Sequence, residues 1–143
     1  LAGRAAPFLV SPDTPHTYHY VRDVAAGLAA LGTAGDDVLG KVWMLPCAPA
    51  VTSRALVDRF AVALGRPIRI RRLPRLALSA LGLAVPLIRE LNEMAYQWEE
   101  PFVVDDRRFR ARFPEVAPTP LDAAARETVE WAVAAYGEGR GRP

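Results

Sequence analysis

Residues 16–25 read His16-Thr17-Tyr18-His19-Tyr20-Val21-Arg22-Asp23-Val24-Ala25 and hold the sharpest change of pattern in the chain. Aromatic and β-branched side chains crowd the first six positions, which predicts a strand over 16–21. A helix is predicted to follow at once, with its apolar stripe at Val24, Leu28 and Leu31. Asp23 stands in its first turn, where a carboxylate can accept from free backbone N–H groups, and Gly32 is its predicted end. A strand that leads directly into a helix is the repeating unit of an α/β fold.

The rest of the chain repeats this alternation. Residues 1–15 are predicted to be a connector with at most a short strand at 8–10, residues 16–137 a single lobe, and residues 138–143 a flexible tail. Further strands are predicted over 41–45, 67–73 and 102–104. The clearest helix begins after the N-cap residue Thr52 and ends at Gly65. Other helices are predicted over 75–98 with a break at 82–86, from Asp105 or Asp106 past Phe113, and from Thr119, the predicted N-cap, to Gly137. We therefore expect an α/β fold of helices with a few short, mostly parallel strands.

Composition narrows the class of protein. The chain has 143 residues and is 51% hydrophobic, enough for one domain with a core. Its 18 basic side chains face 16 acidic ones, which argues against a nucleic-acid partner. Cys47 is the only cysteine, so a disulfide-stapled secreted scaffold is excluded and we expect a cytoplasmic protein with a packed, inert thiol. The most apolar stretch, residues 76–88, is too short to span a bilayer, so we expect no membrane partner.

Nucleotide-binding signatures are missing. A dinucleotide fingerprint places closely spaced glycines directly after a strand, whereas Gly32 and Gly35 follow a predicted helix. Lys41 is the only lysine and no tyrosine stands four residues before it, so the chain has no Tyr-x-x-x-Lys pair. His16 and His19 lie three apart on a predicted strand and point to opposite faces, which argues against a shared metal ion. We expect this chain to bind no cofactor or metal of its own.

Aromatic side chains near the ends of elements mark a candidate small-molecule site. Tyr18 and Tyr20 share one face of the predicted strand, and Tyr96 and Trp98 end a predicted helix just before a loop. Ordinary core packing is the alternative explanation for these rings. The carboxylates at Glu90, Glu93, Glu99, Glu100, Asp105 and Asp106 are interpreted as ion pairs with nearby arginines and as helix caps. The arginines between Arg66 and Arg75 are interpreted as the exposed face of a strand, with phosphate or nucleic-acid binding as the weaker alternative.

The order of these segments resembles the C-terminal portion of the extended short-chain dehydrogenase/reductase superfamily, the NAD-dependent epimerase/dehydratase group. Five stretches carry the resemblance in the family's order: residues 17–25, residues 40–46 with the helix from Thr52 to Pro67, residues 68–74, residues 102–106, and residues 118–131. Together they cover nearly the whole chain.

The resemblance implies a substrate-binding lobe without the cofactor-binding half. In that family the Rossmann half holds NAD or NADP and the Tyr-x-x-x-Lys pair, so this chain alone is predicted to be inactive and to have no catalytic residues. The chain begins at Leu1 rather than methionine, which we interpret as a hint of a longer parent. By position, the resemblance places six residues in the substrate cleft: His16, Tyr18, Tyr20, Tyr96, Gln97 and Trp98. Nucleotide-sugar members carry an arginine where this chain has His16, which argues against such a substrate.

A stand-alone module is the main alternative. Such a protein would use this lobe for protein interaction, oligomerisation or small-molecule binding. A lobe without its neighbour exposes apolar surface and sheet edges, which favour association. The expected partners are therefore a small-molecule substrate, and either the cofactor-binding half of a parent enzyme or a second copy of this chain in a dimer or higher oligomer.

Overall fold

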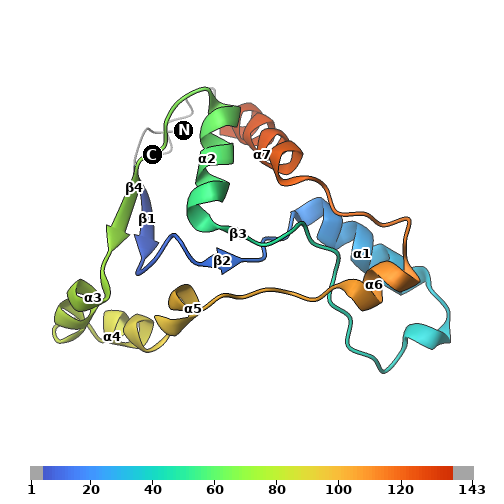
Figure 1. The fold of residues 1–143 in the computed structure, drawn as a ribbon, viewed down its shortest axis with the longest axis horizontal. Coiled ribbons are helices and arrows are strands. Elements are labelled where there is room, and N and C mark those ends of the chain that lie inside the picture. Colours follow the sequence, from blue (N-terminus) through green and yellow to red (C-terminus); the bar gives the residue numbers. More distant parts are fainter. Residues whose placement is uncertain (1–4, 137–143) are drawn as a thin grey trace.

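The computed structural model describes residues 5–136, which form an α/β arrangement of helices and a few short strands (Figure 1). The strands are β1 (Ala6–Leu9), β2 (Pro15–His16), β3 (Val51–Thr52) and β4 (Ile70–Leu73). The helices are α1 (Val21–Thr33), α2 (Ser53–Leu64), α3 (Arg75–Gly82), α4 (Pro86–Glu93), α5 (Tyr96–Glu99), α6 (Arg107–Arg112) and α7 (Leu121–Tyr136), with a 3-10 turn, η1 (Asp36–Val38). The predicted tail at 138–143 lies outside the described residues.

The elements surround an open, roughly triangular outline (Figure 1). Helices α2 and α7 pack together at one corner, and α3 and α4 pack together at another. Helices α1 and α6 occupy the third. The accessible surface is 9992 Å². A compact monomer of 15.6 kDa exposes about 7,200 Å². The chain therefore leaves far more surface uncovered than a self-contained domain of its size.

Two small apolar clusters replace a single core. The first lies where β1 ends and holds the buried residues Val10, Leu78 and Ala95, with Leu9, Leu73, Ile88 and Trp98 packed around them. The second joins α1 to α6 and holds Val38, Phe109 and Phe113. In it the ring centroids of Phe109 and Phe113 lie 4.9 Å apart, and Trp43 meets Phe113 edge-on. Each corner is thus stabilised by its own packing.

A short hydrogen-bonded strip connects the corners. Strand β2 pairs antiparallel with β3, Pro15 opposite Thr52 and His16 opposite Val51. On its other edge the Thr17 N–H donates to the Phe102 carbonyl at 2.8 Å, and the Phe102 N–H donates to the Pro15 carbonyl at 3.1 Å. Residues 15–17 therefore hold two distant parts of the sequence side by side.

The predicted strands are only partly present. The strand predicted over 16–21 is limited to Pro15–His16, because no described residue pairs with the backbone beyond Thr17 in a ladder. The strand predicted over 41–45 is wrong: this segment forms no ladder, and Trp43 and Leu45 pack against the second cluster instead. Residues 102–104 contribute one parallel bridge, between His16 and Phe102.

The described strands form one parallel and one antiparallel pair, and the parallel pair is the longer one. Strand β4 pairs in parallel with β1, from Ala6 opposite Ile70 to Leu9 opposite Leu73. Strand β1 lies within the stretch predicted to be a connector. The strand predicted over 67–73 begins three residues later than expected, at Ile70, and ends at Leu73 as predicted.

The predicted capping is confirmed at α2 and is wrong at α1. The Thr52 hydroxyl accepts from the Ala55 N–H at 3.1 Å, and Gly65 ends α2 in the left-handed region with φ of 65°. The Asp23 carboxylate does not cap α1. It instead accepts from the Thr119 N–H at 2.8 Å and from the Thr119 hydroxyl at 2.7 Å. This buried pair ties α1 to the segment that leads into α7.

The predicted apolar stripe of α1 is only partly buried. Leu28 is exposed, whereas Asp23 and Gly27 are the buried residues of this helix. A Cβ atom at Gly27 would lie 3.0 Å from a methyl carbon of Leu45 and 3.1 Å from the Pro46 ring. Glycine at this position lets the extended segment 41–47 run directly across α1.

This close approach gives a stability prediction. We expect Gly27→Val to lower the free energy of unfolding by roughly 1–3 kcal/mol, because its branched side chain has no room beside Leu45 and Pro46. Gly32→Val on the same helix is the matched control, since a Cβ there meets nothing within 4 Å. Urea unfolding should place the control within about 0.5 kcal/mol of the wild type. Equal losses in both variants would contradict the close packing at Gly27.

Candidate functional site

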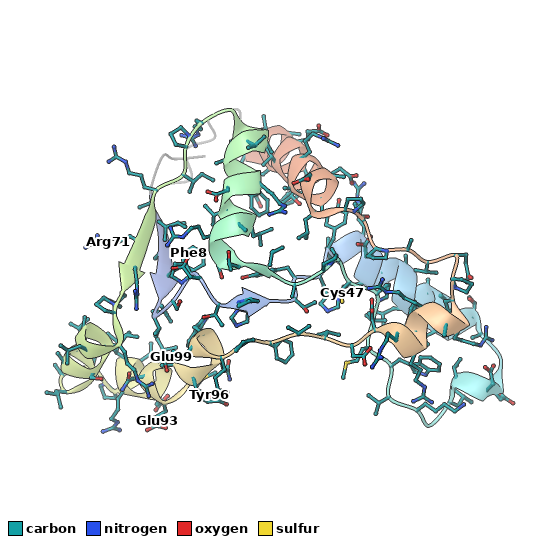
Figure 2. All side chains as sticks on the ribbon, in the orientation of Figure 1. Phe8, Cys47, Arg71, Glu93, Tyr96 and Glu99 are labelled. Atoms are coloured by element: carbon teal, nitrogen blue, oxygen red, sulfur yellow. The ribbon has the colours of Figure 1, made fainter. Side chains whose placement is uncertain are left out.

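A cleft of about 710 Å³ opens beside the central strip. Strands β1 and β2, the start of α2, helix α5 and the segment after it form its walls. Its lining residues are Phe8, His16, Thr17, Tyr18, Ser53, Tyr96, Gln97, Trp98, Glu100, Pro101 and Phe102. Figure 2 labels two of them, Phe8 on β1 and Tyr96 on α5, which are far apart in sequence.

Five of the six residues predicted to face a substrate line this cleft: His16, Tyr18, Tyr96, Gln97 and Trp98. Tyr20 does not. Its hydroxyl donates to the Glu127 carboxylate on α7 at 2.7 Å, a contact that raises the pKa of Tyr20 above its ordinary value. The prediction placed Tyr18 and Tyr20 on one strand face. The backbone leaves the strand before either residue, so the two hydroxyls reach different helices.

Sequence reasoning missed Phe8, Thr17, Ser53, Glu100, Pro101 and Phe102. Phe8 enters the cleft because β1 pairs with β4, a partnership more than sixty residues away that carries no local signal. Ser53 enters because α2 begins directly after β3. Phe102 had one usable signal, an aromatic residue just past the predicted helix end at Trp98.

The His16 ring lies between two backbone carbonyl groups. One ring nitrogen lies 2.8 Å from the Gln97 carbonyl oxygen and the other lies 3.0 Å from the Thr14 carbonyl oxygen. A neutral imidazole has a single N–H, so in that form only one of these two contacts is a hydrogen bond. The contact with the Gln97 carbonyl links β2 to α5.

Hydroxyl groups supply most of the uncharged polar chemistry of the cleft. The oxygens of Tyr18 and Ser53 lie 2.6 Å apart, and Ser53 is buried at the first residue of α2. The Thr17 hydroxyl oxygen accepts from the Val104 N–H at 3.0 Å, which fixes the segment that carries Phe102. The Tyr18–Ser53 pair can both donate to and accept from a ligand hydroxyl, carbonyl or amine.

The charge of the cleft is one-sided. Among the described residues that line it, Glu100 is the only acidic side chain and none is an arginine or a lysine. The neighbouring Glu99 is engaged elsewhere, in an ion pair with Arg75 at the start of α3. A phosphate or carboxylate ligand would find no cationic side chain in this wall.

The described residues hold no cluster of the side chains that bind metal ions. In residues 5–136 no group of three His, Cys, Asp or Glu side chains lies close enough to hold a metal ion. His19 is exposed and outside the cleft lining, so it does not join His16.

Cys47 belongs to a buried clamp away from the cleft. The Cys47 N–H donates to the Asp106 carboxylate at 2.9 Å, and Arg110 donates both to Asp106 at 2.8 Å and to the Cys47 carbonyl at 3.1 Å. Burial, together with the Asp106 carboxylate, raises the pKa of the Cys47 thiol. A buried thiol beside a carboxylate is a poor nucleophile, which confirms the prediction of a packed cysteine.

The acidic residues before α6 form the expected ion pairs. Asp105 pairs with Arg107, which lowers the pKa of Asp105 to about 2. Burial opposes ionisation of Asp106, but its hydrogen bonds from Arg110 and Cys47 outweigh burial and lower its pKa below 3.8. Asp106 therefore stays charged and holds segment 41–47 against α6.

This clamp predicts an acid-dependent loss of stability. A carboxyl with a lowered pKa in the folded state stabilises the protein above pH about 4, and that contribution disappears as pH falls through its folded pKa. We expect Asp106→Asn to lower the free energy of unfolding at pH 7 by roughly 1.5–3 kcal/mol, the scale of hydrogen bonds to a charged group. The deficit should shrink as pH is lowered below 4. Urea unfolding between pH 7 and pH 3 measures the deficit and its dependence on pH. Asp36→Asn is the control. A deficit that stays constant across this range would contradict the clamp.

No protein-family model matches this sequence, and no curated protein matches it either. Among the described helices, none has both the length and the apolar composition that a transmembrane segment requires.

Proposed function

We propose that this chain is the substrate-binding lobe of an NAD(P)-dependent epimerase, dehydratase or reductase, and that its cleft takes a ring-bearing molecule that is uncharged or cationic. The observation that carries the proposal is the cleft itself. Five residues selected from the sequence, drawn from the two distant stretches 16–18 and 96–98, line one cavity. A volume of about 710 Å³ falls within the range of small-molecule sites.

The lining favours this ligand chemistry. Aromatic side chains contribute five of the lining residues: Phe8, Tyr18, Tyr96, Trp98 and Phe102. Flat aromatic faces bind apolar rings and attract organic cations. Glu100 adds a negative charge at the same wall, and the Tyr18–Ser53 hydroxyl pair offers hydrogen bonds. None of the described lining residues is an arginine or a lysine, which disfavours phosphorylated substrates, including nucleotide sugars.

Two features support a lobe over a complete enzyme. The sequence has no glycine fingerprint and no Tyr-x-x-x-Lys pair. In the described part of the chain, β1 and β4 form a parallel sheet of only two strands, whereas parallel sheets ordinarily have more strands and covered faces. The cofactor-binding half of a parent enzyme would extend this sheet and cover the surplus surface. NAD or NADP would belong to that half.

A stand-alone interaction module is the second candidate, and the exposed side chains of α1 and α7 favour it. Val21 and Leu28 on α1, and Trp131 and Tyr136 on α7, are all more than half exposed. Such side chains promote self-association. Sedimentation of the chain over a range of concentrations distinguishes the two candidates. A stable dimer without any ligand binding supports the module.

Ligand binding tests the cleft directly. We expect benzylamine and benzyl alcohol to bind in preference to benzoate and phenyl phosphate, because the lining offers rings, hydroxyls and Glu100 but no cationic side chain. Chemical shift perturbation of the chain by each probe ranks the four. A preference for benzoate or phenyl phosphate would overturn the proposed ligand class.

Substitutions in the lining test whether benzylamine binds in the cleft. Tyr96→Ala removes a half-exposed ring from the lining and should weaken benzylamine about threefold to tenfold. Trp131→Ala is the matched control, since its ring is comparably exposed but lies on α7 and outside the lining. Trp98→Ala should weaken binding further, although Trp98 also packs against the first cluster and its unfolding must be checked. The lobe assignment itself predicts no saturable NADH binding by this chain, so saturable binding would refute that assignment and leave the cleft result standing.

A further inference from the structure

Strand β4 lies at an edge of the described sheet. Strand β1 pairs along one side of it, and Figure 1 shows no described element beside its other side. The Ala6 N–H donates to the Arg69 carbonyl at 2.8 Å, and the Val10 N–H donates to the Leu73 carbonyl at 3.0 Å. The carbonyl groups of Arg69 and Leu73 therefore face β1.

The other side of β4 offers unpaired backbone groups. Along a strand the backbone groups of successive residues point to alternate sides, so those of Ile70 and Arg72 point away from β1. Among the described residues, none makes a backbone hydrogen bond to either of them. An open strand edge of this kind is a template for one more strand.

The sequence around this edge is strongly basic. Residues 66–75 contain five of the 18 basic side chains of the chain, all of them arginines, and no acidic residue. All five arginines are exposed. The nearly balanced charge of the whole chain therefore conceals a short basic segment that contains β4.

Two of these arginines already have acidic neighbours. Arg75 pairs with Glu99 on α5. Arg72 lies near Asp13, whose pKa is lowered chiefly by its hydrogen bond from Arg54 and, to a smaller extent, by Arg72. Neither Arg72 nor Arg75 is therefore fully available to a partner.

Arg69 and Arg71 are available, and they lie on one face of the strand. In the part of the chain that the structure describes, neither side chain makes an ion pair or a hydrogen bond. Figure 2 shows Arg71 on the outer side of β4. Residues two apart on a strand share a face and lie about 6.6 Å from one another. An added strand has the same spacing, so acidic side chains at every second position can pair with both guanidinium groups.

We propose that β4 takes an extended acidic segment of another protein as a third strand, with carboxylates at alternate positions facing Arg69 and Arg71. The backbone of Ile70 and Arg72 supplies the hydrogen bonds, and the two arginines supply selectivity. This pairing uses the open edge and the unbalanced charge together. The inference goes beyond the proposed function and does not depend on it, because a cofactor-binding half can extend the same sheet at β1.

Other occupants fit this edge less well. A second β4 would place arginines opposite arginines, which opposes pairing between copies of the chain. A nucleic acid or a lipid surface has no peptide backbone to continue the ladder, and residues 66–75 contain no aromatic ring for base stacking. Residues 1–4 and 137–143 contain three arginines and one glutamate, so neither segment supplies an acidic strand.

The probe is an acetylated and amidated octapeptide of alternating glutamate and threonine, added to the full chain in an NMR titration near neutral pH. We expect saturable shifts of the amide signals of β4. A peptide with lysine in place of glutamate should bind at least about tenfold more weakly, since it presents like charge to the arginines. The glutamate peptide with every backbone N–H methylated should also bind about tenfold more weakly, because it can donate no hydrogen bond to the strand.

Charge reversal tests the two arginines. The double variant Arg69→Glu with Arg71→Glu should weaken binding of the acidic peptide at least about tenfold and strengthen binding of the lysine peptide. Arg89→Glu with Arg126→Glu is the matched control, because both arginines are exposed, lie outside the strand and change the net charge equally. The control should stay within about threefold of the wild type, since salt screens distant charges.

A proline isolates the contribution of the backbone. Arg72→Pro and Arg72→Ala remove the same charge, but only proline also removes the N–H that points away from β1. We expect the proline variant to bind the acidic peptide about threefold to tenfold more weakly than the alanine variant, the scale of one hydrogen bond. Circular dichroism checks that both variants keep the wild-type fold, and the peptide and charge-reversal arms stand without them.

Three results would rule the proposal out. The first is unchanged binding of the acidic peptide after reversal of Arg69 and Arg71. The second is equal binding by two folded Arg72 variants. The third is an oligothymidylate or a phosphatidylglycerol vesicle that binds as tightly as the acidic peptide.

Discussion

The hydrogen bonds on both edges of residues 15–17 are the constraint on which the rest of the structure depends. One edge pairs with β3, and the other edge meets Phe102. Because no continuous core spans the molecule, this strip is what brings the start of α2 and the segment after α5 to the same place. The Thr17 hydroxyl reinforces it by accepting from the Val104 N–H. The cleft lies beside the strip for this reason: its walls are the elements that the strip joins.

Around that strip, each corner is stabilised by a different kind of interaction. Aromatic packing of Phe109 and Phe113 and the Asp106 clamp hold α6 against α1 and segment 41–47. The Asp23–Thr119 pair ties α1 to the approach of α7. Aliphatic packing around Leu78 holds α3 and α4 to β1 and β4. The uncovered surface that results is too large for a closed domain.

Features that depend on neighbours in the chain were predictable. Thr52 and Gly65 bound a helix through contacts within three or four residues, and the break in the 75–98 helix follows from Gly82 and Pro86. Aromatic residues next to helix and strand ends indicated three cleft residues, Tyr18, Tyr96 and Trp98, and the family resemblance added His16 and Gln97. Pairings across the sequence were not predictable. The segment 41–45 has the composition of a strand, yet no other strand lies beside it, so its apolar side chains pack into a cluster instead.

The sequence by itself determined the coarse α/β class, the two ends of α2 and the missing cofactor motifs. These depend on residue identity and short spacings, which act before the chain is folded. Tertiary structure alone decided that Phe8 joins the cleft, that Tyr20 leaves it for Glu127, and that the His16 ring lies between the Thr14 and Gln97 carbonyls. It also decided that Leu83 faces outward while Leu78 is buried. The physical reason is that a hydrogen bond or a packing contact between distant residues exists only once the strip at residues 15–17 has brought their elements together.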